Sequence, residues 1–383
     1  MSKQKKLGTQ YIHAGVHPDP STGAIMTPIY QTSTFVQSAP GVHKGYEYAR
    51  SQNPTRFALE EAFAVIENGK YGLAFSSGVA ATDAVMRLLV PGDEVICAHD
   101  MYGGTYRLFS KVYEKIGIVF NYVDTSNAEN IANAMTPKTK LIWIETPTNP
   151  LMNISDIEAI SKIGKKHNCV VCVDNTFASP YLQNPLDLGA TIVMHSATKY
   201  LGGHSDVIQG ALMLNDDALR DQLYFIQKST GAVPGPQDCF LVLRGIKTLH
   251  VRMQRHCENG EKVATYLRQH SKIAKVYWCG FEDHPNHIIA KKQMRGFGGM
   301  ISFTLQDDSI EAATKVLSST KIFSLAESLG GVESLINHPA SMTHASIPRE
   351  IRVANGLTDG LIRLSVGIED IEDIIADLEQ AIG

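Results

Sequence analysis

The chain has 383 residues, with 35 Lys and Arg against 39 Asp and Glu, so its formal net charge is −4 with neutral histidines. This mild acidity gives no reason to expect a nucleic-acid partner. The 44% of apolar and 19% of charged residues exclude a disordered or fibrous chain, and the length favours two domains.

The chain shows no pattern of a secretory signal or a membrane span. The lysines among the first six residues are followed by no apolar run, and charged residues interrupt the most apolar stretch, 71–90. Six cysteines are too few for a disulfide framework in a chain this long. We therefore expect a cytoplasmic protein that does not contact a membrane.

The predicted elements begin with an extended arm over residues 1–47, which is rich in Pro and Gly, lacks periodicity and suits contact with another subunit. Helical and short apolar runs then alternate. Helices are expected at 57–68, 79–89, 106–115 and 154–167, and strands at 72–75, 94–98, 119–123, 141–145, 170–174 and 192–195. Short, nearly uniform apolar strands separated by helices predict a mostly parallel sheet that is buried on both faces. Residues 48–245 therefore form an α/β domain.

The pattern changes after Pro234-Gly-Pro236. A long helical region runs with breaks to about His270, and a strand at 300–305 then mixes with helices at 309–318 and 370–381. This pattern predicts a smaller α+β domain over residues 246–383.

Reactive side chains follow two of the predicted strands. Asp174 ends the run 170–173, and Lys199 follows the run 192–194 after Ser196 and Thr198. Ligands bind at the carboxyl ends of strands in such sheets, and one crossover separates these two ends. A lysine beside hydroxyl groups suits a Schiff base next to a phosphate, and an aspartate suits a protonated pyridine nitrogen. Together they predict a pyridoxal phosphate site.

Two further segments fit this site. A strand turns through Ser77 and Gly78 into a helix, whose free amides can hold a phosphate, and Tyr102 follows another strand and can lie against a planar ring. Each feature alone has an ordinary alternative: a solvated lysine, an aspartate that caps a helix, a plain turn or a core aromatic residue. Purely structural roles explain any one of these residues, but they explain far less easily why all of them stand at the ends of predicted strands.

No metal site is expected. Cys169 and Cys172 have C-x-x-C spacing but lie in a predicted strand, where side chains three apart face opposite ways. The pairs His284 with His287 and His338 with His344 lack accompanying ligands, so we expect surface or loop histidines.

Six segments resemble the Cys/Met-metabolism family of pyridoxal-phosphate enzymes. They cover residues 48–56, 100–105, 145–150, 173–180, 196–200 and 363–369, in the order of the family's motifs. The resemblance extends over essentially the whole chain. It implies a fold-type I transferase-like architecture with pyridoxal phosphate as the cofactor.

The resemblance also assigns roles at the cofactor. Lys199 binds it covalently, Asp174 pairs with the pyridine nitrogen, and Tyr102 stacks on the ring. The phosphate is held by Ser77, Gly78, the amide of Val79, Ser196 and Thr198. Tyr48 and Arg50 match residues that reach the phosphate of a neighbouring subunit, so we expect dimers with shared sites that pair into a homotetramer.

For the substrate, the resemblance implies that Arg363 grips the α-carboxylate with help from Asn149 and Ser328. Glu327 suits the distal ammonium of a long diamino acid, and Arg107 its distal carboxylate, although a helix-capping Glu327 and a solvated Arg107 remain the simpler alternative.

These residues favour the α,γ-elimination of L-cystathionine to L-cysteine, 2-oxobutanoate and ammonia, which is cystathionine γ-lyase chemistry. Cystathionine γ-synthase shares its early steps and is the main alternative, with methionine γ-lyase and cystathionine β-lyase behind it. Gly104 departs from the cysteine usual in methionine γ-lyases.

Two other classes remain for comparison. A nicotinamide dehydrogenase needs G-x-G-x-x-G after a first strand, which the glycines at 296–299 do not provide. A catalytically inactive scaffold would have little need for the reactive residues together.

Overall fold

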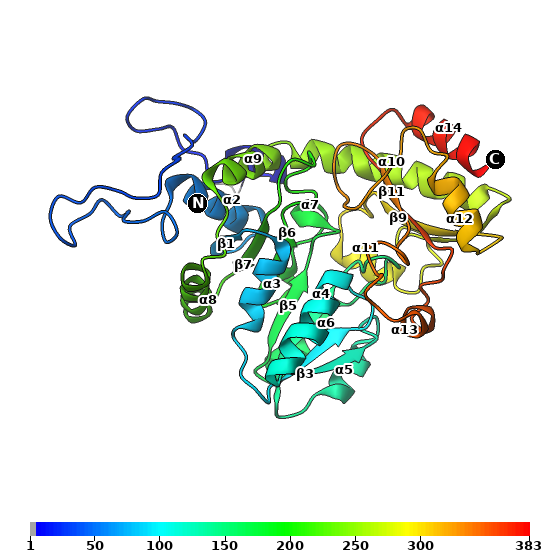
Figure 1. Ribbon diagram of the computed structural model, residues 1–383, viewed down its shortest axis with the longest axis horizontal. Helices are drawn as coiled ribbons and strands as arrows, with labels where there is room; N and C mark the ends of the chain where they lie inside the picture. The colour runs from blue at the N-terminus through cyan, green and yellow to red at the C-terminus, as the bar shows by residue number, and fades with distance from the viewer. Residues whose placement is uncertain (1–4) are drawn as a thin grey trace.

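The computed structural model describes residues 5–383, so the first four residues of the predicted arm lie outside it. Its larger sheet has seven strands in the order β1-β7-β6-β5-β4-β2-β3 (Figure 1). The strands are β1 (Tyr71–Phe75), β2 (Glu94–Ala98), β3 (Val119–Val123), β4 (Thr139–Glu145), β5 (Val170–Asp174), β6 (Ile192–Ser196) and β7 (Gly210–Leu214). All pairs are parallel except those of β7, which runs antiparallel to β1 and β6. The predicted mostly parallel sheet is confirmed.

Helices cover both faces of this sheet, as the uniformly apolar strands require. The first face packs against α2 (Pro54–Ile66), α5 (Ala128–Ala134), α6 (Ile157–Lys166) and α9 (Pro236–Ile246). The second face packs against α3 (Gly78–Met86), α4 (Gly103–Leu108) with the following π-helix Phe109–Tyr113, and α8 (Asp217–Thr230). Cys169 and Cys172 are buried in clusters on opposite faces, as their spacing predicted.

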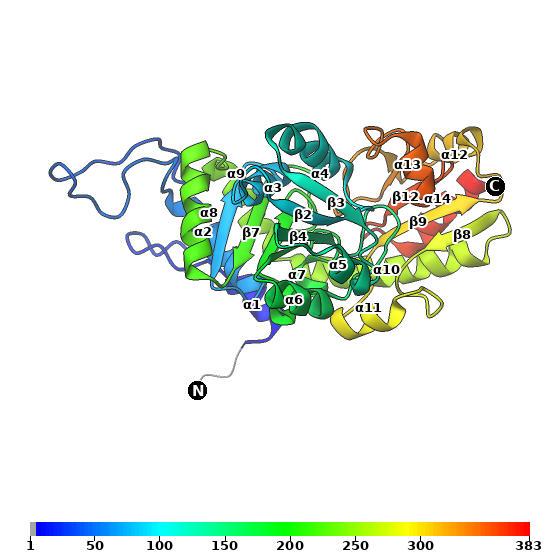
Figure 2. The same ribbon diagram turned by 90° about the horizontal axis from the view of Figure 1, so that it is seen from below.

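A second sheet has five strands in the order β10-β11-β12-β9-β8. They are β8 (Ile273–Tyr277), β9 (Met300–Leu305), β10 (Ser324–Leu325), β11 (Leu335–Asn337) and β12 (Ile362–Ser365). Its helices are α10 (Leu249–Gln269), α11 (His287–Gln293), α12 (Ile310–Leu317), α13 (Arg349–Ala354) and α14 (Ile371–Ile382). The long helix α10 contributes to the cores of both parts, so the two sheets are joined along it (Figure 2). The division between residues 245 and 246 stays a prediction, and it falls within the last turn of α9.

The N-terminal segment combines a helix with projecting loops. Helix α1 (Leu7–His13) packs on the chain's own body through the fully buried Tyr11. The following loops, drawn in blue, extend away from the body in both views (Figures 1 and 2). They expose apolar side chains, with Val36 at 95% and Ile25 at 84% of their surface. The chain itself therefore leaves these residues uncovered.

Helix α4 begins three residues before the predicted start at Tyr106. Its first two residues, Gly103 and Gly104, would each carry a Cβ only 2.3 Å from a neighbouring atom, Thr343 O and Tyr102 Cε1 respectively. Glycine is therefore needed for close packing here, although propensity alone predicts no helix at Gly-Gly. Among residues 5–383, no helix has the length and apolar character needed to span a membrane.

Candidate active site

A cavity of about 960 Å³ opens at the carboxyl ends of β5 and β6, which are neighbours in the larger sheet. Asp174 and Lys199 both line it, as the strand-end argument predicted. The other predicted residues that line it are Ser77, Gly78, Val79, Tyr102, Arg107, Asn149, Ser196, Thr198, Glu327, Ser328 and Arg363. Residues from both sheets thus meet in a single cavity.

The start of α3 forms a cradle at one side of the cavity. Ser77 caps the helix through its Oγ, which accepts from the amide of Ala80 at 3.0 Å, and the first-turn amides of Gly78 and Val79 have no partner within the helix. Gly78 lies so close to β6 that an added Cβ would be 2.9 Å from Ser196 Cβ. Free amides, the positive end of a helix and a nearby hydroxyl fit a phosphate group.

Asp174 presents a carboxylate to the cavity. Its Oδ1 accepts from the amide of Thr176 at 3.0 Å and from Thr176 Oγ1 at 2.5 Å, while no hydrogen bond formed by residues 5–383 reaches Oδ2. Burial raises the pKa of Asp174, and the bonds from Thr176 oppose that shift. A free carboxylate oxygen in a buried position fits the protonated nitrogen of a pyridine ring.

Glu145 lies beside Asp174 in the register of β4 and β5. Its carboxylate accepts from the backbone amides of Tyr102 at 2.9 Å and Asn149 at 2.8 Å. Burial, and then the neighbouring Asp174, raise the pKa of Glu145. This side chain therefore fixes the loops that carry Tyr102 and Asn149, a role that sequence reasoning did not assign to it.

Lys199 is poised as a reactive amine. Its Nζ donates to Ser328 Oγ at 2.7 Å, and Ser328 adopts a left-handed φ of 94°, which is uncommon for a residue other than glycine. Burial and then the guanidinium of Arg363 lower the pKa of Lys199 to about 8, while Glu327 opposes this shift. An amine with this pKa is available in its neutral, nucleophilic form near physiological pH.

Arg363 is held as a fork at the floor of the cavity. Its Nη1 donates to Asn149 Oδ1 at 2.7 Å and its Nη2 donates to the carbonyl of Ser328 at 2.9 Å, while the buried Nε has no hydrogen-bond partner in residues 5–383. Burial lowers the pKa of Arg363 to about 10, so the guanidinium stays charged at neutral pH. A rigid guanidinium with an unsatisfied donor fits a carboxylate ligand.

The outer part of the cavity carries three exposed polar side chains, Tyr102, Arg107 and Glu327. Neither Arg107 nor Glu327 forms an ion pair with another of the described residues. Burial raises the pKa of the Tyr102 hydroxyl, an effect that Arg107 opposes. The cavity therefore offers one cation and one anion to a ligand that extends beyond Lys199.

Tyr48 and Arg50 do not line the cavity of their own chain. Both are exposed, and Arg50 Nη1 donates to the carbonyl of Lys228 at the end of α8 at 2.5 Å. Their predicted contribution to a neighbouring subunit's phosphate stays a prediction.

Other side chains at the site extend the sequence analysis. His338 and His344 lie in a turn-rich loop segment, one of the two expected placements, and they are loop rather than surface histidines because they are buried, at 6% and 1% exposed. The Nε2 of His344 contacts the carbonyl of Asn149 at 3.0 Å.

Within residues 5–383, no three His, Cys, Asp or Glu side chains are grouped to bind a metal ion. Thr176 was also missed, because its bond to Asp174 depends on the turn after β5.

The fold and the cavity define a class. A mostly parallel sheet with a lysine and an aspartate on adjacent strand ends, beside a helix start that fits a phosphate, is the arrangement of a fold-type I pyridoxal phosphate enzyme. The match of residues 8–383 to the family model "Cys/Met metabolism PLP-dependent enzyme" shows that the chain belongs to this family, and pyridoxal phosphate is its cofactor.

The relatives carry three different names. The chain is 53% identical to cystathionine beta-lyase of Coxiella burnetii, over 100% of this chain and 99% of the relative. It is 52% identical to cystathionine gamma-lyase of Dictyostelium discoideum (98% and 97%) and to cystathionine gamma-synthase of Mycobacterium bovis (98% and 96%). The crystal structure of cystathionine gamma-lyase from Lactobacillus plantarum complexed with L-serine superposes with a TM-score of 0.96 at 48% identity, over 98% of each chain. These relatives support the same family, but their names divide among three activities: β-lyase, γ-lyase and γ-synthase.

Proposed function

We propose that this enzyme is a cystathionine γ-lyase, which cleaves L-cystathionine with water to L-cysteine, 2-oxobutanoate and ammonia. The observation that carries the proposal is the pair of unpartnered charges, Glu327 and Arg107, in the cavity that also contains Lys199 and Arg363. L-Cystathionine has an amino acid group at each end. Arg363 suits the α-carboxylate at the reacting end, while Glu327 and Arg107 suit the distal ammonium and carboxylate.

In this proposal the cofactor is held by the residues that fit it. Asp174 would pair with the ring nitrogen, Tyr102 would lie against the ring and Lys199 would bind the cofactor covalently. The phosphate would be held by Ser77, Gly78, Val79, Ser196 and Thr198. When bound, pyridoxal phosphate supplies an electron sink for the negative charge left when a proton leaves the substrate's α-carbon.

The chain's own groups then move the protons. The amine of Lys199, released when the substrate binds, takes the α proton and would pass it on to the cofactor's C4′ position; neutral again, the amine then takes a proton from the β-carbon. Tyr102 donates a proton to the sulfur as the bond between the γ-carbon and sulfur breaks, and cysteine leaves first. Hydrolysis of the remaining four-carbon fragment gives 2-oxobutanoate and ammonia.

The position of Lys199 supports this role. Lys199 donates to the side-chain Oγ of Ser328, and the backbone carbonyl of the same residue accepts from Arg363, so Ser328 positions both the base and the guanidinium. A lysine fixed at this point can reach adjacent carbons of a substrate whose carboxylate Arg363 holds.

The second candidate is cystathionine γ-synthase, which the name of the Mycobacterium bovis relative supports. It starts from an acylated homoserine and adds cysteine. The β-lyase name of the Coxiella burnetii relative supports cleavage on the other side of the sulfur, and Gly104 counts against methionine γ-lyase because it departs from that enzyme's pattern.

We also propose a cytoplasmic homotetramer of dimers with shared sites. The exposed arm, with Val36 and Ile25 uncovered, supports contact with another copy, and Tyr48 and Arg50 are exposed at the end of this arm, from where we propose that they reach that copy's phosphate cradle.

Substrate kinetics of Glu327→Gln test the proposal. Loss of a charged hydrogen bond to the distal ammonium should raise KM for L-cystathionine about tenfold. An acylated homoserine has no distal ammonium, so its KM should stay unchanged. Glu311→Gln, on the exposed start of α12, is the matched control. Unchanged KM for L-cystathionine would contradict the role of Glu327.

A further inference from the structure

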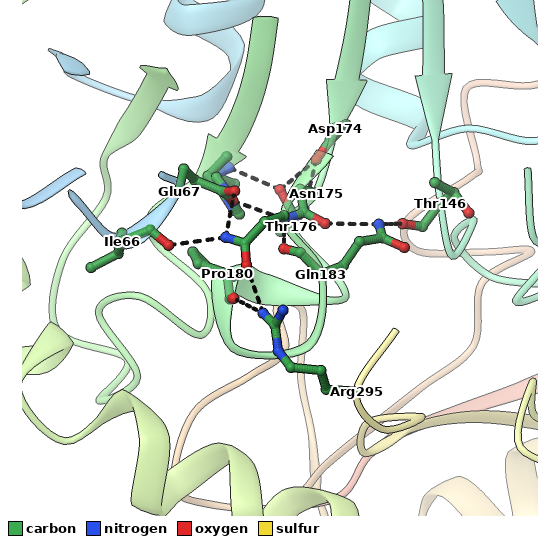
Figure 3. A network of polar contacts seen from close by, with 12 residues as sticks. Ile66, Glu67, Thr146, Asp174, Asn175, Thr176, Pro180, Gln183 and Arg295 are labelled. Atoms are coloured by element: carbon green, nitrogen blue, oxygen red, sulfur yellow. Dashed lines mark hydrogen bonds and ion pairs between the residues drawn. The ribbon is translucent and has the colours of Figure 1, made fainter. Parts of the chain in front are cut away.

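Glu67, which follows the last residue of α2, lies fully buried behind the strand ends that carry the site. Figure 3 shows it within a network of polar side chains beside Asn175. Its Oε1 contacts Asn175 Nδ2 at 2.8 Å and His195 Nε2 at 2.5 Å, and its Oε2 contacts Asn184 Nδ2 at 3.2 Å. One carboxylate thus joins Asn175, which follows β5, to His195, which lies next to the last residue of β6.

Asn175 and His195 face away from the cavity. Their chain neighbours Asp174, Met194 and Ser196 line it, and side chains alternate along extended backbone. Glu67 therefore contacts the two strand ends on the side away from the cavity, while the candidate catalytic residues lie on the cavity side.

The surrounding hydrogen bonds determine which groups donate to Glu67. Asn175 Oδ1 accepts from Gln183 Nε2 at 3.0 Å, and Asn184 Oδ1 accepts from Arg295 Nη2 at 2.7 Å, contacts that lie in the network of Figure 3. Both amides therefore direct their NH₂ groups at Glu67. The third contact, with His195 Nε2, joins the same carboxylate to β6.

On the cavity side, a separate set of hydrogen bonds joins the same two strand ends. Thr176 Oγ1 donates to Asp174 Oδ1 at 2.5 Å and accepts from the amide of Ser196 at 2.9 Å. The turn after β5 is thus linked to the end of β6 on both sides, by Thr176 on the cavity side and by Glu67 on the opposite side.

We propose that Glu67 is a positioning residue for the cofactor site: through Asn175 and His195, it fixes Asp174 relative to Ser196 and Lys199. A carboxylate suits this role because both of its oxygens can accept hydrogen bonds, whereas an amide presents one acceptor and one donor. The inference rests on the proposed roles of Asp174 and Lys199 at the cofactor.

The test is Glu67→Gln, measured by titrating the apoenzyme with pyridoxal phosphate. The amide NH₂ of the new side chain must face Asn184 or the pair Asn175 and His195, so a contact is lost and the strand ends shift. We expect the Kd of the cofactor to rise about tenfold. We also expect a changed visible circular dichroism signal from the bound cofactor, which reports its orientation.

Asp377→Asn is the matched control. Asp377 is also buried, and it accepts from the amides of Lys321, Ile322 and Phe323 at 2.7 to 3.0 Å, outside the cavity. This variant should lower the melting temperature yet leave the cofactor's Kd and dichroism unchanged. A merely structural role for Glu67 predicts the same behaviour for Glu67→Gln.

His195→Leu provides a second variant if Glu67→Gln does not fold. It leaves Glu67 its two amide donors and removes only the link to β6, so it should also weaken cofactor binding. Wild-type Kd and dichroism in folded samples of the variants would overturn this inference. Failure of the wild-type enzyme to bind pyridoxal phosphate would instead overturn the proposed function.

Discussion

The phosphate cradle makes a sharp prediction for Gly78→Ala. A Cβ built at Gly78 would lie 2.9 Å from Ser196 Cβ, 3.1 Å from its Oγ and 3.2 Å from its Cα. Rotation of the serine hydroxyl cannot relieve contacts with Cβ and Cα, so the start of α3 must move away from β6. That movement displaces the free amides of Gly78 and Val79 from the position of the phosphate.

The size of the effect follows from the cost of overpacking. Inserting a methyl group into a tight contact costs about 1–3 kcal/mol. If the helix start moves to relieve this clash, the same free energy is lost from phosphate binding, and the Kd of pyridoxal phosphate rises about 5- to 150-fold. The assay is a titration of the apoenzyme, followed by cofactor absorbance, with the melting temperature of the apoenzyme measured in parallel.

Gly235→Ala is the control for this prediction. The nearest atom to its added Cβ is Asp238 Oδ2 at 3.7 Å, which is an ordinary contact, so the cofactor's Kd should stay at its wild-type value. Wild-type affinity in Gly78→Ala would refute the assignment of this helix start to the phosphate.

Three other predictions concern the substrate, acid stability and assembly. Arg107→Gln should raise KM for L-cystathionine about tenfold without changing the melting temperature, because this exposed side chain forms no ion pair in residues 5–383; an unchanged KM in steady-state assays would contradict its role. Burial lowers the pKa of His256 and His344 to about 4 each, so the unfolded chain binds more protons between pH 6.5 and 4 and stability is lost as the pH falls through this range. Each histidine accounts for a loss of about 3 kcal/mol in the free energy of unfolding over this pH range. Denaturant titrations at pH 7 and 4.5 should therefore show a smaller loss of this free energy in His256→Gln than in the wild type; an equal loss would be inconsistent with this origin. Finally, inactive Arg50→Ala and Lys199→Ala subunits should regain activity when co-expressed, because a mixed dimer has one intact shared site, and hybrids without activity would argue against sharing.

The parallel strands of the larger sheet and their reactive ends were predictable because each depends on local pattern. Buried parallel strands are short apolar runs, and Asp174 and Lys199 stand directly after two of them. The neighbouring positions of β5 and β6 then brought both residues into one cavity. The antiparallel strand β7 was not predicted, since its five residues follow a long loop with no turn pattern that indicates its direction.

The supports behind the site could not be found in this way. Glu67 and His195 are 128 residues apart, and their contact exists only once α2 packs on the sheet. Glu145 was visible at a strand end, but its bonds to the amides of Tyr102 and Asn149 depend on how two loops close over it. Such side chains read as ordinary polar residues in the sequence because their partners are set by tertiary packing.

The position of the bond that breaks distinguishes the proposed γ-lyase activity from β-lyase activity. Purified holoenzyme should be incubated with L-cystathionine and the products identified by mass spectrometry. Cysteine with 2-oxobutanoate is the predicted result, since Lys199 and Tyr102 are proposed to serve cleavage between the γ-carbon and sulfur. Homocysteine with pyruvate would show cleavage at the β-carbon and contradict the proposed mechanism.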